Sequence, residues 1–105
     1  MKPIDFRNET WRDVELRVEG LRREVYYALA KAGACTTRQL AEKSGIDLLT
    51  VRPRVTELYQ IGLVELVNEE SGGGEGIYRT IPWPVARANF DKLKLNAAEK
   101  QLNLL

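Results

Sequence analysis

The sequence predicts a mainly helical α+β domain, in which core helices precede a two-stranded β-hairpin and further helical segments lie at both ends. Three observations support this class. Apolar residues recur at helical spacing up to residue 61, two β-branched and aromatic runs at 63–67 and 77–81 flank a glycine-rich stretch, and a last helical pattern follows. A chain of 105 residues holds one modest core.

We therefore expect a single domain with extensions. The expected divisions are an N-terminal tail at 1–9, the domain itself at 10–84, a C-terminal helix at 85–100 and a flexible tail at 101–105.

Composition narrows the range of functions. With 44% hydrophobic and 30% charged residues the chain resembles a soluble globular protein, and no apolar run reaches the roughly 18 residues that cross a bilayer. The start, MKPIDFRNE, lacks the apolar part of a secretory signal, so we expect a cytoplasmic protein without membrane contact. Because the net charge is only +1, any nucleic-acid contact must come from local placement of basic residues.

The chain has one cysteine, Cys35, and no histidine. These counts exclude intrachain disulfides, Cys/His zinc sites and the Ser-His-Asp or Cys-His catalytic arrangements. The only glycine cluster, SGGGEG at 71–76, does not precede a helix as a phosphate-binding loop would. We expect no enzyme activity, no metal and no cofactor. Cys35 is predicted to be a small buried hydrophobe, with a redox-sensing thiol as the alternative.

The first helical pattern covers about 10–32. Thr10 and Asp13 have the spacing of a capping box, which marks its start. Gly20 interrupts the apolar pattern, so we expect a bend or break there, and Gly33 suits the C-terminal end.

The second helix is predicted to start at a capping box formed by Thr36 and Gln39 and to end at Ser44-Gly45. Where the third helix begins depends on Pro53. With Asp47 as N-cap, Pro53 lies beyond the first turn and costs about 3 kcal/mol. With Thr50 as N-cap, Pro53 occupies the third helical position, whose amide has no partner in any helix. The second option is cheaper, so we expect a tight turn or a loose helical turn at 47–50 and regular helix from about 50 to 61.

Gly62 closes the third helix, and the strands at 63–67 and 77–81 form a hairpin. Pro82 and Pro84 end it. The last helix should place Val85, Phe90, Leu93 and Ala97 on one side. Trp11 and Trp83 are expected to pack in the core or in an interface.

This order of elements is that of a winged helix-turn-helix. The run TTRQLAEKSGIDLLTVRPRVTELYQIGLVEL resembles the helix-turn-helix of small MarR-type and phage-encoded regulators, and the resemblance covers about residues 21–81. It implies a bacterial or phage protein that binds double-stranded DNA, as a transcriptional regulator or a replication-associated accessory factor. It also implies a homodimer formed through the first helix and the C-terminal segment, because palindromic half-sites need a two-fold protein.

The resemblance implies that the helix containing Pro53 docks in the major groove. Arg52 or Arg54 could then bind a guanine edge or a phosphate, and Pro53 would stiffen the exposed end of the helix. The alternative is that both arginines belong to a solvated face. Because Glu69, Glu70 and Glu75 at the wing tip repel phosphate, we do not expect the wing to enter the minor groove. The candidate DNA-binding residues are Thr36, Thr37, Arg38, Thr50, Arg52, Pro53, Arg54 and Thr56.

The last five residues, QLNLL, resemble the short bacterial motif that binds the sliding clamp. In that interpretation Gln101 would hydrogen-bond at the edge of a pocket, and Leu102, Leu104 and Leu105 would fill apolar subsites. The alternative is that these leucines pack onto their own domain or onto a dimer mate. The motif gives a rival function, in which the winged-helix domain is a protein-binding adaptor, its tail tethers it to a sliding clamp, and DNA is touched weakly or not at all.

Overall fold

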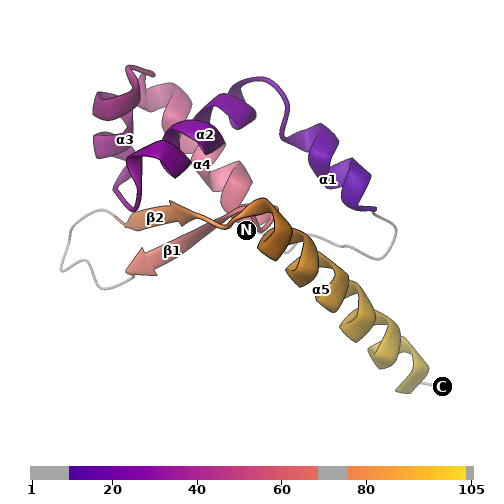
Figure 1. Cartoon of the computed structure of the whole chain (residues 1–105). Helices are drawn as coiled ribbons and strands as arrows, with labels where there is room; N and C mark the ends of the chain where they lie inside the picture. The colour runs from indigo at the N-terminus through magenta and orange to yellow at the C-terminus, as the bar shows by residue number, and fades with distance from the viewer. Residues whose placement is uncertain (1–9, 69–75, 104–105) are drawn as a thin grey trace.

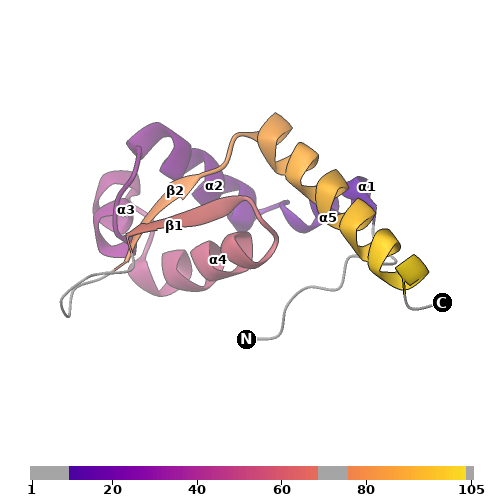
Figure 2. The same ribbon diagram turned by 90° about the horizontal axis from the view of Figure 1, so that it is seen from below.

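The computed structural model describes residues 10–68 and 76–103 (Figure 1). In chain order the elements are α1 (Trp11–Arg17), α2 (Leu21–Ala32), α3 (Thr37–Ser44), α4 (Leu48–Gln60), β1 (Val64–Asn68), β2 (Ile77–Thr80) and α5 (Trp83–Asn103). Helices α2, α3 and α4 pack together on the hairpin, and α5 extends away from them beside α1 (Figures 1 and 2). The predicted mainly helical α+β class is confirmed.

The starts of the first three helices follow from local sequence. Thr10 and Asp13 form the predicted capping box, with the Thr10 N–H donating to the Asp13 carboxylate at 2.8 Å. This backbone hydrogen bond lowers the pKa of Asp13. The expected break at Gly20 is confirmed, since Gly20 has a φ of 69° and separates α1 from α2. Thr36 and Gln39 form the second capping box, and Gly45 ends α3 in the left-handed conformation.

The predicted N-cap of α4, Thr50, is wrong, and the segment for which a tight or loose helical turn was expected belongs to the regular helix. The helix begins at Leu48, and the carbonyl of its N-cap, Asp47, accepts hydrogen bonds from the amides of Thr50 and Val51, both at 2.9 Å. Pro53 is therefore the sixth helical residue instead of the third. The two hydrogen bonds to the Asp47 carbonyl and the partial burial of Leu48 stabilise a helix that begins at Leu48.

The missing amide of Pro53 leaves the carbonyl of Leu49 without its helical donor. Both residues lie on the exposed side of α4, where water can hydrogen-bond that carbonyl. This exposure explains how the helix tolerates an interior proline.

The end of α4 sets the position of the hairpin. The N–H of Leu63 donates to the Leu58 carbonyl at 2.9 Å and that of Gly62, with φ 83°, to the Tyr59 carbonyl at 3.2 Å. These two bonds make a Schellman motif, and Leu63 and Leu58 are both fully buried beside it. The strands pair antiparallel, with Val64 opposite Thr80.

One cluster of buried residues joins all the helices to the hairpin. Cys35 is 2% exposed, as expected for a small buried hydrophobe, and burial raises the pKa of its thiol. Trp11 packs edge-on against Trp83 and Phe90, with ring centroids 5.1 and 5.7 Å apart, which confirms the packing role predicted for both tryptophans. The buried members of the cluster are Trp11, Val14, Val18, Val25, Tyr26, Leu29, Cys35, Leu40, Val51, Val55, Leu58, Leu63, Val64, Ala86 and Phe90.

Helix α5 differs from its prediction in bounds and in orientation. It starts two residues before the predicted 85, and its helical backbone includes the first three residues of the predicted tail at 101–105. Ala86 and Phe90 face the core, because Trp83 docks on Trp11 and fixes the rotation of the helix. Val85 and Leu93, expected on the buried side, are instead about half exposed. Among the described residues no helix is long and apolar enough to span a membrane.

Candidate nucleic-acid interface

A hollow of about 280 Å³ lies where α3, α4 and the hairpin meet, and we call it the wing-side groove. It brings together three of the predicted DNA-binding residues, Thr37 from α3 with Arg52 and Thr56 from α4. Arg52 and Thr56 are exposed and lie one helical turn apart. The groove is lined by Thr37, Arg52, Val55, Thr56, Gly76 and Tyr78.

The capping box of α3 explains the position of Thr37. The Thr36 hydroxyl oxygen accepts a hydrogen bond from the Gln39 N–H at 3.1 Å, and the Thr36 N–H donates to Gln39 Oε1 at 3.0 Å. Thr36 thus caps the start of the helix, and Thr37 and Arg38 occupy its first turn. The first amides of a helix have no helical acceptors and carry partial positive charge. This end of α3 is suited to meet an anion.

The two arginines of α4 have different surroundings. Arg52 is exposed and lines the groove. The Arg54 side chain is 31% exposed, and its Nη2 lies 3.2 Å from Glu57 Oε1. Glu57 also accepts a hydrogen bond from Arg22 Nε of α2, so one carboxylate serves two guanidinium groups. The Arg22–Glu57 pair joins α2 to α4, and Arg54 pairs with the same carboxylate from within α4. Because Arg52 is exposed and lines the groove, it is the better candidate for a DNA contact.

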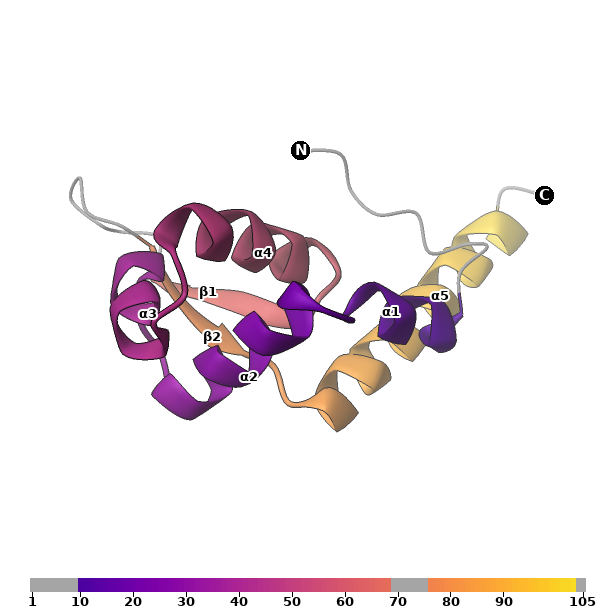
Figure 3. The ribbon, with the colours of Figure 1, turned by 90° about the horizontal axis from the view of Figure 1, so that it is seen from above.

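The outer side of α4 is exposed along its N-terminal half. Thr50 is half-buried, whereas Pro53 and Thr56 are exposed and Leu49 keeps 77% of its surface accessible. In the view from above, α4 lies along the outer edge of the helical group (Figure 3).

Sequence reasoning missed three residues of the groove, Val55, Gly76 and Tyr78. Tyr78 exchanges backbone hydrogen bonds of 3.0 and 2.8 Å with Cys35, which fixes β2 against the start of α3. Gly76 lies so close to the hairpin that an added Cβ would stand 2.7 Å from Leu66 Cδ1. The position of Gly76 directly before the second strand was the only signal in the sequence.

The prediction that the wing does not enter the minor groove depends on Glu69, Glu70 and Glu75, which lie outside the described residues. On the described strands, Arg79 donates a hydrogen bond to the Glu65 carboxylate directly across the hairpin. Of the residues in the predicted clamp motif, Gln101 and Leu102 fall within the range of α5, whereas Leu104 and Leu105 lie outside the described residues.

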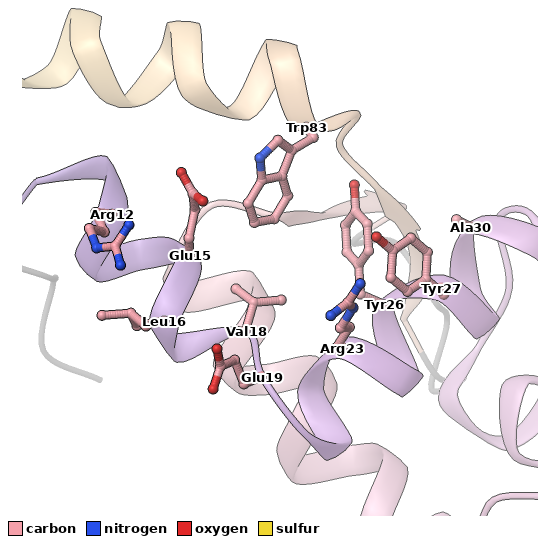
Figure 4. A pocket seen from close by; sticks show the side chains of 10 residues that line it. All are labelled: Arg12, Glu15, Leu16, Val18, Glu19, Arg23, Tyr26, Tyr27, Ala30 and Trp83. Carbon is pink, nitrogen blue, oxygen red and sulfur yellow. The ribbon is translucent and has the colours of Figure 1, made fainter.

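A second cavity, of about 720 Å³, lies between α1, α2 and the start of α5 (Figure 4). Its charged lining consists of two arginines and two glutamates, and Arg23 lies over the Tyr27 ring at 5.7 Å. The Tyr26 hydroxyl donates to the Ile81 carbonyl at 2.8 Å, and burial raises the pKa of Tyr26. The lining residues are Arg12, Glu15, Leu16, Val18, Glu19, Arg23, Tyr26, Tyr27, Ala30 and Trp83.

Within the residues that the structure describes, no three His, Cys, Asp or Glu side chains are grouped closely enough to hold a metal ion.

Solved structures of transcriptional regulators share this fold. A possible transcriptional regulator from Methanosarcina mazei is 20% identical, with 97% of this chain and 92% of that chain covered and a TM-score of 0.59. A MarR family regulator from Neisseria meningitidis is also 20% identical, over 90% of this chain and 65% of that one, with a TM-score of 0.52.

A third similar structure is the homodimeric winged helix-turn-helix DNA-binding domain of a possible ArsR-family regulator from Mycobacterium bovis. It is 27% identical, with 94% of this chain and 92% of that chain covered and a TM-score of 0.54. No protein-family profile and no curated protein sequence matches the chain. The similarities confirm that the fold is a winged helix-turn-helix resembling MarR and ArsR regulators, with α3 and α4 as its helix-turn-helix and the hairpin as its wing.

Proposed function

We propose that this protein binds duplex DNA through the exposed side of α4 and acts as a transcriptional regulator. The observation that carries the proposal is the wing-side groove, in which Thr37 of α3 meets Arg52 and Thr56 of α4. The similar structures are described as transcriptional regulators, and one as a DNA-binding domain, which supports the same function.

The dimensions of α4 suit the major groove. Its 13 residues span about 20 Å, and a single helix fits within the roughly 12 Å width of that groove. With α4 inserted, Thr37 and Arg38 at the start of α3 would face the sugar-phosphate backbone, as the first helix does in helix-turn-helix complexes. Arg52 would contact a phosphate or a base edge, and Thr50 and Thr56 would supply short hydroxyl donors.

We further propose that the protein is a homodimer joined through α1 and α5. Ala86 and Phe90 face the protein's own core, whereas Val85, Leu93 and Leu95 on α5 are 48%, 50% and 65% exposed. A helix with apolar residues on several sides is suited to pack against two surfaces, and the second would belong to the other subunit. The domain from Mycobacterium bovis is homodimeric. Sedimentation equilibrium tests this: a twofold molar mass is expected, and a monomer at micromolar concentration would contradict it.

A regulator of this kind acts on the chromosome, so its proposed location is the cytoplasm. No enzymatic role is part of the proposal.

The test is a titration of duplex DNA, followed by fluorescence anisotropy, at several salt concentrations. Affinity should fall steeply with salt, since phosphate contacts release counterions. Arg52→Ala should weaken binding to all duplexes and lower the magnitude of the salt slope by about one, the value of a single phosphate contact. Arg23→Ala, at an exposed site on α2 outside the groove and the proposed dimer helices, is the matched control. A response that is flat in salt, or equal effects of both variants, would reject this interface.

The second candidate function is an adaptor tethered to a sliding clamp, which rests on the QLNLL sequence and on the net charge of +1. Deleting 101–105 separates the two. If the motif acts as proposed, the shortened protein loses capture by an immobilised bacterial clamp and keeps its affinity for duplex DNA. Unchanged capture would remove the motif from consideration.

A further inference from the structure

The outer side of α4 carries an exposed apolar stripe that consists of Leu49, Pro53 and Thr56. The spacing of four and then three residues places these side chains in one line along the helix. Leu49 is 77% exposed, the largest fraction among the big hydrophobic side chains of the described residues. The buried residues Val51 and Val55 lie on the opposite side of the helix, so the stripe points directly away from the core.

A single exposed leucine needs no explanation in a soluble protein. Here the leucine is followed along the same line by a pyrrolidine ring and a threonine methyl group, in the half of α4 that would enter the major groove. Arg52 flanks the stripe on one side, and Thr37 faces it across the wing-side groove. The surroundings thus combine apolar groups in the centre with a cation and hydroxyls at the edge, which matches base edges bordered by phosphates.

We infer that this stripe reads the methyl groups of thymine, so that the protein selects A·T pairs at adjacent positions of its site. The inference rests on the proposed DNA binding and specifies which bases are recognised. In the major groove thymine presents a C5 methyl group, whereas guanine presents two acceptors and cytosine an amino donor. An A·T pair also presents polar groups there, but only thymine adds a methyl group that leucine and proline side chains can bury. Against a G·C pair the same side chains meet polar edges alone and gain no apolar contact.

The length of the stripe sets the number of positions. Thr56 follows Leu49 by seven positions, which corresponds to about 10 Å along the helix axis. Base pairs repeat at roughly 3.4 Å along the duplex, so the stripe spans about three steps. We therefore assign two or three consecutive positions of each half-site to thymine contacts.

The experiment replaces thymine by deoxyuridine, which removes the methyl group and keeps the hydrogen-bonding edges. A preferred duplex is first selected from a random library with the full chain, and each thymine is then replaced singly. We expect affinity to fall about fourfold at two or three adjacent positions, the effect of losing one buried methyl group. In the Leu49→Ala variant, deoxyuridine at one of these positions should no longer lower the affinity. In the Thr56→Ser variant, deoxyuridine at another of them should no longer lower it.

Leu21→Ala, at an exposed leucine that opens α2 and lies outside both α4 and the proposed dimer helices, is the control and should retain the wild-type pattern. Tight binding of a selected duplex with no loss at any deoxyuridine would overturn the thymine inference and leave the proposed function intact. A loss that persists unchanged in both α4 variants would also overturn it. If no duplex is bound at all, the proposed function fails together with the inference.

Discussion

Replacing Pro53 by alanine should make the protein more stable. As the sixth residue of α4, Pro53 removes the amide that would donate to the Leu49 carbonyl. A proline inside a helix is about 3 kcal/mol less favourable than alanine. Proline also restricts the unfolded chain, so its replacement raises the entropy of the unfolded state and lowers the stability gain by roughly 0.4–1 kcal/mol. The expected net gain is therefore about 2 kcal/mol, which corresponds to a rise in Tm of roughly 10 °C for a domain of this size.

Thermal and urea unfolding followed by circular dichroism measure this change. Pro84→Ala is the matched control, because Pro84 is the second residue of α5, where the amide has no helical acceptor. That variant should gain nothing. If Pro53→Ala instead destabilises the protein slightly, Pro53 lies in the first turn of its helix, Thr50 is the N-cap, and α4 does not begin at Leu48.

Three further predictions concern stability and reactivity. Glu57→Gln should lower the free energy of unfolding by about 1–2 kcal/mol in urea, since Arg22 and Arg54 are left partly buried without a carboxylate, and an unchanged midpoint would contradict this pairing. Gly62→Ala should cost about 1 kcal/mol because its φ of 83° suits glycine, and a neutral result would place the end of α4 elsewhere. Burial raises the pKa of the Cys35 thiol, so the native protein should react with iodoacetamide far more slowly than the urea-unfolded chain, and its stability should decline as pH rises above the ordinary thiol pKa. Equal alkylation rates would show that Cys35 is accessible.

Features set by neighbouring residues were predictable from the sequence. Thr10 and Thr36 head capping boxes whose partners lie three residues away, and Gly20 breaks the helix through its own backbone conformation. The groove residues Thr37, Arg52 and Thr56 were also chosen from their places in the helix-turn-helix pattern, and the structure brings them together.

Features that depend on distant contacts were not predictable. The start of α4 was assigned from the local cost of a proline, which neglected two hydrogen bonds to Asp47 and the exposure of the affected carbonyl. The rotation of α5 depends on Trp83 meeting Trp11, far away in the sequence. Arg54 and Arg52 could not be distinguished from the sequence, because the contact of Arg54 with Glu57, which also pairs with Arg22 35 residues away, is seen only in the structure.

The central claim is that the exposed side of α4 docks on duplex DNA. An NMR titration of the isotope-labelled full chain with its selected duplex tests this most directly, because each backbone amide reports its own surroundings. Docking through α4 predicts the largest changes in amide chemical shift in the first turn of α3, in 48–56 of α4 and at Tyr78 in the wing-side groove. The amides along the cavity between α1 and α2 should change little. Shifts concentrated in that cavity or along α5, with α4 unaffected, would contradict it.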